Sequence, residues 1–69
     1  MSISARNKLK GKVSEIVIGD VMAEVTIRVG QNIIDAIITR RSAEELKLKK
    51  GDTVVAVIKA TEVMVSKDA

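Results

Sequence analysis

The sequence predicts a small all-β domain, a five-stranded OB-like barrel with one short helix between its third and fourth strands. Hydrophobic residues make up 46% of the 69 residues, yet Phe, Trp and Tyr are absent, so the core must consist mainly of Val, Ile and Ala. Branched side chains of this kind favour strands. Apolar and polar residues also alternate in several short runs, as in half-buried strands. The runs follow the order three strands, a helix and two strands, which suits an OB-like barrel; an SH3-like barrel is the competing architecture.

The whole chain, residues 1–69, is expected to form a single domain, because it contains no linker and no low-complexity stretch. Its first three strands are predicted at residues 11–18, 22–29 and 33–39. The turn Gly19-Asp20 ends the first strand, and a hairpin turn at Gly30-Gln31-Asn32 joins the second to the third. A domain this short buries only about 60% of its unfolded surface, so we expect self-association to support it.

The third predicted strand carries isoleucine on both faces. Ile34 and Ile38 share one face with Ala36, whereas Ile33 and Ile37 share the other. In a single antiparallel sheet one face is normally polar. The second apolar face therefore indicates either contact with another subunit or burial within the chain's own barrel, and the strand alone favours neither.

A short helix is predicted after the third strand. Ser42 and Glu45 have the spacing of a capping box, in which each side chain bonds the amide of the other residue. Lysines follow at the expected negative end of the helix, and Gly51 supplies the stop. The last two strands are predicted at residues 53–59 and 62–65, with a bend at Ala60-Thr61 between them.

The composition excludes several classes of function. Cys and His are absent, which removes disulfides, thiolate nucleophiles, histidine bases and the usual zinc ligands. The carboxylates are scattered, and neither a calcium-loop pattern nor a glycine-rich phosphate loop occurs. We therefore expect a protein that is not an enzyme and that binds no free metal cation. The sequence contains no run of about 20 apolar residues that could span a membrane and no signal-peptide pattern, so a cytoplasmic protein is expected.

The net charge of +3 favours an anionic partner. A nucleic acid is one candidate, but single-strand-binding barrels stack bases on aromatic side chains, which this chain lacks. An interaction module that needs a partner chain is another candidate. A small oxyanion fits better than a nucleic acid, because it requires many N–H and O–H donors and limited positive charge.

Candidate donors for such an anion occur in three places: Ser4, Arg6 and Asn7 near the start, Thr39 and Ser42 around the helix start, and Lys59 at the end of the fourth strand. Each also has an ordinary structural explanation. Ser42 suits a helix N-cap, whereas Arg6 and Lys59 suit solvated surface positions.

These donors lie in segments that resemble a known family. "SARN" near the start, then "GKV", "TRRSAEELKLKKGD" and "VVAVIKATEVMV", together resemble the molbindins, small cytoplasmic molybdate-binding proteins built from one Mop-type (TOBE) domain. The likeness covers about residues 3–65, and "SARN" and "IKATEVM" are specific when found together in so short a chain. The resemblance implies an OB-like barrel that assembles as a homohexamer, a trimer of dimers. It also implies storage or buffering of molybdate and tungstate for molybdenum homeostasis, with no organic cofactor.

The resemblance further implies which residues hold the ion. Ser4, Ala5 and Arg6 stand in the "SARN" segment, where Ser4 and Arg6 match the family's donors. Lys59 and Ala60 match a positive charge and a backbone amide that contribute to the same ion. Asn7 is expected to support the loop instead of touching the ligand.

Two further groups of residues follow from the same resemblance. Thr39 and Ser42 match a hydroxyl pair that a neighbouring subunit presents to the ion, which would place the sites at subunit interfaces. A second kind of site near three-fold axes is placed loosely at Gly19 and Asn32.

Overall fold

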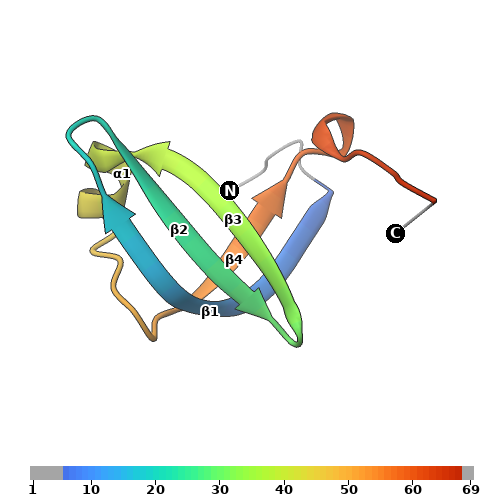
Figure 1. The fold of residues 1–69 in the computed structure, drawn as a ribbon, viewed down its shortest axis with the longest axis horizontal. Helices are drawn as coiled ribbons and strands as arrows, with labels where there is room; N and C mark the ends of the chain where they lie inside the picture. Colours follow the sequence, from blue (N-terminus) through green and yellow to red (C-terminus); the bar gives the residue numbers. More distant parts are fainter. Residues whose placement is uncertain (1–5, 68–69) are drawn as a thin grey trace.

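The computed structural model describes residues 6–67. It contains one four-stranded antiparallel sheet in the order β3-β2-β1-β4 (Figure 1). The elements are β1 (Asn7–Ile18), β2 (Met22–Val29), β3 (Asn32–Thr39), α1 (Arg40–Glu45), β4 (Thr53–Ile58) and the 3-10 turn η1 (Ala60–Glu62). The all-β class and the helix between the third and fourth strands are therefore confirmed. The predicted range of β2 is identical to the observed one, and β1 begins four residues earlier than predicted.

Strand β1 joins the two halves of the sheet because it pairs with two neighbours. Its first half pairs with β4 and its second half with β2, so Lys12 lies opposite both Thr53 and Arg28. The strand bends strongly between these partners, as Figure 1 shows, and the register shifts just after the bend, between Val13 and Glu15. Gly11 lies next to this change of partner.

The inner face of the curved sheet forms a small aliphatic core. Val13, Val25, Ile27 and Ala56 are buried and pack together, and β3 adds half-buried isoleucines from its inner side. The alternation predicted for β2 is confirmed, because Val25 and Ile27 are buried while Glu24 and Arg28 on the opposite face of the strand are exposed. The core thus lies between the sheet's two edge strands and on the concave side of β1.

The predicted fifth strand is wrong for the described part of the chain. Glu62 ends η1, and residues 63–66 belong to no strand; Met64 and Val65 are each 93% exposed. Within residues 6–67 the two edge strands, β3 and β4, do not pair with each other, so the sheet is not closed into a barrel. The fifth strand does not form because a strand must pair with the free edge of a neighbouring strand. The chain after η1 runs away from the sheet instead of along such an edge (Figure 1).

The helix α1 begins and ends at residues other than those predicted. Thr39 is its N-cap: the Thr39 Oγ1 atom accepts the Ser42 backbone N–H at 3.0 Å, so the capping box between Ser42 and Glu45 is wrong. The helix ends at Glu45, well before Gly51. Lys47 takes a left-handed conformation, with φ of 52°, and closes the helix in the role that glycine usually fills.

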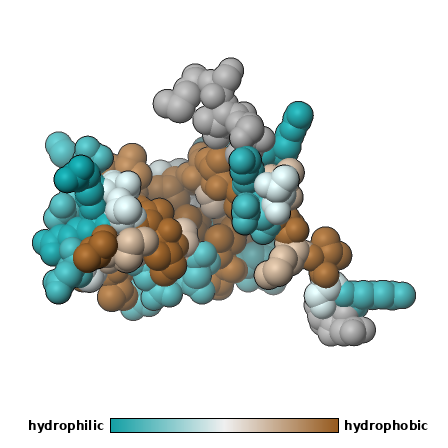
Figure 2. All heavy atoms as spheres, turned by 90° about the horizontal axis from the view of Figure 1, so that it is seen from above, coloured by the Kyte–Doolittle hydropathy of each residue, from teal (hydrophilic) through white to brown (hydrophobic). Residues whose placement is uncertain are grey.

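The outer isoleucines of β3 are not covered by the rest of the chain. Ile33 is 57% exposed and Ile37 is 60% exposed, so burial within the chain's own barrel does not explain them. Apolar surface is also prominent in Figure 2, where apolar atoms gather across the middle of the molecule and polar atoms at the end that carries α1. Within the described residues, no helix is long and apolar enough to cross a membrane.

Candidate functional site

The end of the sheet where β1 begins and β4 ends collects the first group of predicted site residues. Asn7 and Ile58 lie opposite each other there, and the Asn7 Nδ2 atom donates to the Ile58 carbonyl oxygen at 3.3 Å. Arg6 precedes Asn7 and Lys59 follows Ile58, and both side chains are exposed. The ladder therefore holds the two cations at the same end of the sheet, and the Asn7 hydrogen bond ties the two strand ends together.

Ala60 continues this group, because it opens η1 directly after Lys59. The Lys59 carbonyl oxygen accepts the Glu62 N–H at 2.9 Å, which closes the turn. The first N–H groups of a helical turn have no partner within it, so the Ala60 amide is not used by the turn's own hydrogen bonds. Ser4 and Ala5, the other predicted members of the group, lie outside the described residues.

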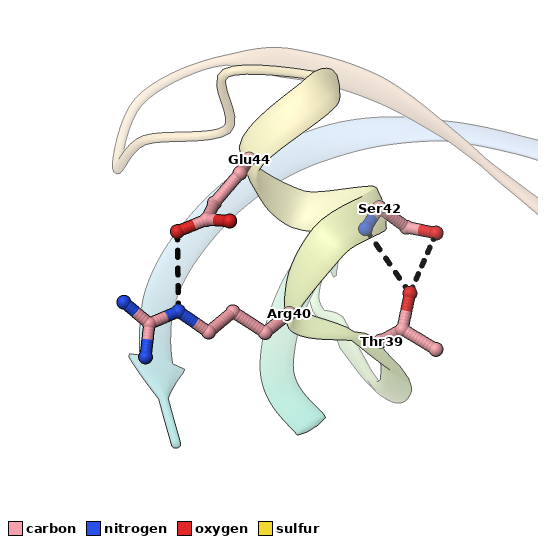
Figure 3. Close-up of polar contacts among 4 residues, drawn as sticks. All are labelled: Thr39, Arg40, Ser42 and Glu44. Carbon is pink, nitrogen blue, oxygen red and sulfur yellow. Dashed lines mark hydrogen bonds and ion pairs between the residues drawn. The ribbon is translucent and has the colours of Figure 1, made fainter. Parts of the chain in front are cut away.

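Thr39 and Ser42 form the second group, at the start of α1 (Figure 3). Besides accepting the Ser42 N–H, the Thr39 Oγ1 atom donates to the Ser42 Oγ atom at 2.8 Å. Two hydroxyls that share one hydrogen bond leave one hydroxyl proton over for an acceptor outside the helix. Thr39 therefore holds Ser42 in place, and the pair can donate one hydroxyl proton to a ligand.

Two arginines beside this hydroxyl pair were not among the predicted site residues. The Arg40 Nε atom lies 3.1 Å from Glu44 Oε2, an ion pair across one helical turn (Figure 3). Arg41 is exposed and takes part in neither of the two ion pairs found among residues 6–67. The sequence pattern that could have identified them is the "TRRS" run, in which two arginines stand between the two hydroxyl residues.

The two groups lie at opposite ends of the molecule. Arg6 and Lys59 stand where β1 begins, whereas Thr39 pairs with Met22, next to the turn that follows the end of β1. Figure 1 shows η1 and α1 at opposite ends of the sheet. A strand rises about 3.3 Å per residue, so even the bent β1 keeps the groups too far apart to share one small ion. A single chain therefore does not bring all the predicted residues together.

The positions predicted for a second site are also separated within one chain. Gly19 lies in the turn between β1 and β2, and its N–H donates to the Met22 carbonyl oxygen at 2.8 Å. Asn32 begins β3 and pairs with Val29 at the far end of β2. The eight residues of β2 thus stand between the two positions.

The described residues provide hydrogen-bond donors and positive charges, which suit an anion better than a metal cation. No cluster of three or more His, Cys, Asp and Glu side chains that could hold a metal ion occurs among residues 6–67. The first group presents a guanidinium, an ammonium and a backbone amide, and the second a hydroxyl beside two arginines. Such groups are suited to a small anion, since charge-assisted donors bind oxyanions most strongly.

Comparisons with known proteins agree with this chemistry. A family model described as the TOBE domain matches residues 3–65. The chain is 52% identical, over 94% of its length and 97% of the relative's, to molybdenum-pterin-binding protein 1 of Clostridium pasteurianum. Among solved structures, it resembles a molybdate-binding protein of Sporomusa ovata, with a TM-score of 0.92 and 46% identity over 97% of this chain and all of that one. It also resembles the cytoplasmic molybdate-binding protein ModG with molybdate bound, with a TM-score of 0.82 and 49% identity over 87% of this chain and 43% of that one.

Proposed function

The chain belongs to the TOBE-domain family, and from this membership we propose that it binds molybdate or tungstate and serves molybdenum storage and homeostasis in the cytoplasm. The relatives that support the proposal are a molybdate-binding protein from Sporomusa ovata and the cytoplasmic protein ModG, whose structure holds molybdate. The protein acts as a binding protein and not as an enzyme, in keeping with the absence of Cys and His.

The observation that carries the proposal is that Arg6, Lys59 and Ala60 follow or precede the paired residues Asn7 and Ile58 at one end of the sheet. Molybdate is a tetrahedral dianion, so about two positive charges neutralise it, and amides and hydroxyls can satisfy its remaining oxygens. Arg6 and Lys59 supply those charges, and the Ala60 amide supplies a donor. No carboxylate is included among the assigned residues. Ser4 and Ala5 are assigned to the same ion on the strength of the "SARN" segment.

A second copy of the chain completes the site. Ser42, oriented by Thr39, stands at the opposite end of the sheet from Arg6, so it reaches the ion from a neighbouring subunit. The resemblance to the molbindins implies that the ions lie at subunit interfaces of a homohexamer arranged as a trimer of dimers, and the separation of the two groups of residues within one chain supports a shared site. The same resemblance implies a second kind of site in that assembly, to which we assign Gly19 and Asn32 from different copies of the chain.

The exposed apolar surface of a single chain supports self-association. An apolar hollow of about 410 Å³ opens between the two unpaired edge strands, lined by inner residues such as Ile34, Ile38 and Ile58. The apolar residues that follow η1 are exposed as well. A chain of 69 residues has few other means of stabilising itself, because it contains no Cys for disulfides.

Isothermal titration calorimetry with molybdate, tungstate and sulfate tests the proposal. We expect binding of molybdate and tungstate at micromolar concentrations and much weaker binding of sulfate. Lys59→Ala is expected to weaken molybdate binding, whereas Lys50→Ala, which removes the same charge from the loop after α1, leaves it unchanged. Absence of molybdate heat at micromolar concentration would contradict the proposal.

A further inference from the structure

Four positively charged side chains form a row on the outer surface of the sheet. Lys8, Lys10 and Lys12 occupy alternate positions of β1, and all three are exposed. The residues between them lie opposite core residues of β4, so the lysines stand on the outer face of the strand. Arg28 of β2 lies opposite Lys12 and is exposed as well. We call these four residues the cationic row.

The cationic row ends beside the residues assigned to the oxyanion. Arg6 stands two positions before Lys8, and Lys59 follows the residue that pairs with Asn7. Figure 1 shows the first half of β1 beside β4, with η1 at the same end of the sheet. A strand rises about 3.3 Å per residue, so neighbouring charges of the row are about 6.6 Å apart and Lys12 lies roughly 20 Å from Arg6 along the strand.

We propose that the cationic row guides molybdate and similar dianions along β1 to the site at Arg6 and Lys59, and thereby raises the rate at which they bind. This inference rests on the proposed oxyanion site and adds the route by which the ion reaches it. A surface lined by one sign of charge concentrates the opposite ion and raises association rates by about 10–10³-fold. The row acts on the arrival of the ion and not on its release, because the bound ion lies beyond its end.

The positive charge of the row is not neutralised by ion pairs. Neither of the two ion pairs found among residues 6–67 includes a member of the row. The row carries four positive charges whereas the whole chain has a net charge of +3, so the rest of the chain is slightly negative. Lys12 and Arg28 also form a like-charge pair across the ladder, which is unfavourable. An anion that passes between them lowers this repulsion.

The charge on the outer face also changes sign along the sheet. Beyond the row, away from the site, Glu15 and Asp35 lie on either side of Thr26. At the site end, the two assigned cations outweigh the one nearby carboxylate in the sequence after Lys59, that of Glu62 in η1. A dianion on this face is therefore repelled from the far end and attracted towards the site.

The neighbouring strand β4 adds apolar side chains to the row and no side-chain donors. Val57 lies opposite Lys8 and Val55 opposite Lys10, and both valines are about half exposed. An oxyanion is held in place by several donors at once, and a lysine between valines supplies only its own ammonium group. Apolar surroundings also strengthen the field of the lysines. The row therefore attracts the ion without retaining it.

Rates of association measured at different salt concentrations test the proposal. Equilibrium dialysis with radiolabelled molybdate gives Kd, a chase with unlabelled molybdate gives the dissociation rate, and the two together give the association rate. We expect the triple variant Lys8→Gln, Lys10→Gln, Lys12→Gln to associate about tenfold more slowly than the wild type at about 0.01 M ionic strength, where the Debye length is about 30 Å. At about 1 M salt, where it is about 3 Å, the difference should fall below about twofold. The dissociation rate should stay within about twofold at both.

Single substitutions that remove one charge each are matched controls for net charge. Lys8→Gln should slow association most, and Lys12→Gln and Arg28→Gln least, because the field of a charge falls with its distance from the site. The triple variant with arginine in place of the three lysines keeps their charges and should associate at the wild-type rate. Native mass spectrometry checks that each variant has the wild-type assembly, and the salt dependence of the wild-type rate tests the proposal without any substitution.

Three results would overturn the proposal. One is a wild-type association rate that does not fall as salt rises. Another is an unchanged rate in the glutamine variant at low salt, which would leave the row to a larger anion such as a nucleic acid. The third is a faster dissociation that accounts for the whole loss of affinity, which would make the lysines ligands of the bound ion. Absence of molybdate binding to the wild type would contradict the proposed function itself, whereas normal binding at an unaltered rate would contradict this inference alone.

Discussion

Gly11→Ala is expected to destabilise the fold strongly, because the sheet leaves no space for a side chain at this position. An added Cβ atom would overlap the backbone carbonyl oxygen of Arg28 and lie 2.9 Å from two methyl carbons, Ile27 Cγ2 and Val29 Cγ2. Carbon atoms normally pack at about 3.5–4.0 Å, so both methyl contacts are at least about 0.6 Å too short. Overpacking of this kind typically costs about 1–3 kcal/mol, and a rigid carbonyl oxygen among the contacts places this substitution near the upper end.

A loss of about 3 kcal/mol is large for a chain of this length. Single domains have about 0.05–0.15 kcal/mol of stability per residue, and 1 kcal/mol shifts the melting temperature of a small domain by about 4–8 °C. We therefore expect a fall of about 12 °C or more in thermal unfolding followed by circular dichroism. Protein concentration must be held constant, because association raises the apparent stability.

Gly30→Ala is the matched control for this experiment. Gly30 has a φ of 61°, but a Cβ atom there would meet nothing within 4 Å. Only the left-handed backbone is then penalised, which costs about 1–2 kcal/mol. If Gly11→Ala destabilised the protein no more than Gly30→Ala, the tight approach of β1 to β2 would be refuted.

Three further substitutions test the candidate site and the helix. Arg6→Ala should weaken molybdate binding by about 10–100-fold, the equivalent of a charge-assisted contact of ~1.5–3 kcal/mol, and leave the oligomer intact; unchanged affinity in calorimetry would remove Arg6 from the site. Thr39→Val should lower stability by about 1 kcal/mol through loss of the α1 cap, and Ser42→Ala by clearly less, since Ser42 contributes its backbone N–H to that cap; the reverse order in thermal unfolding would make Ser42 the cap. Lys47→Gly should raise stability by about 0.5–1 kcal/mol, because glycine adopts a φ of 52° without strain; a lower melting temperature would exclude the left-handed helix end.

The sequence was sufficient to predict those elements whose signal is local. The alternation in β2 predicted its bounds and its buried face correctly, because every second residue packs on a core that the strand itself helps to form. The glycine of the β2–β3 hairpin was found for a similar reason, since Gly30 supplies the positive φ that the two-residue turn requires.

Elements that depend on a neighbour were predicted less well. Residues 62–65 alternate like a strand, but strand formation requires a free edge beside them, and η1 directs the chain away from one. The helix cap was misassigned because Thr39 and Ser42 both suit an N-cap. Thr39 is the N-cap because β3 ends at this residue and α1 begins at the next one.

The sequence predicted which residues belong to the candidate site, but it did not predict how they are arranged in space. The ladder between β1 and β4 places Arg6 and Lys59 at the same end of the sheet, although they are 53 positions apart in the sequence. The Thr39 hydrogen bond that orients the Ser42 hydroxyl depends on a strand running directly into a helix, which composition does not reveal. The family resemblance selected these residues from many exposed polar side chains.

Native mass spectrometry of the wild-type protein with and without molybdate tests whether copies of the chain assemble and share sites for the oxyanion. We expect a homo-oligomer, a hexamer, that gains mass in whole multiples of one molybdate ion and gains none with sulfate at the same concentration. The added mass also separates a bare oxyanion from a molybdenum–pterin ligand. A monomer that binds molybdate with full affinity would contradict a site shared between copies, and an oligomer that binds none would contradict the proposed function.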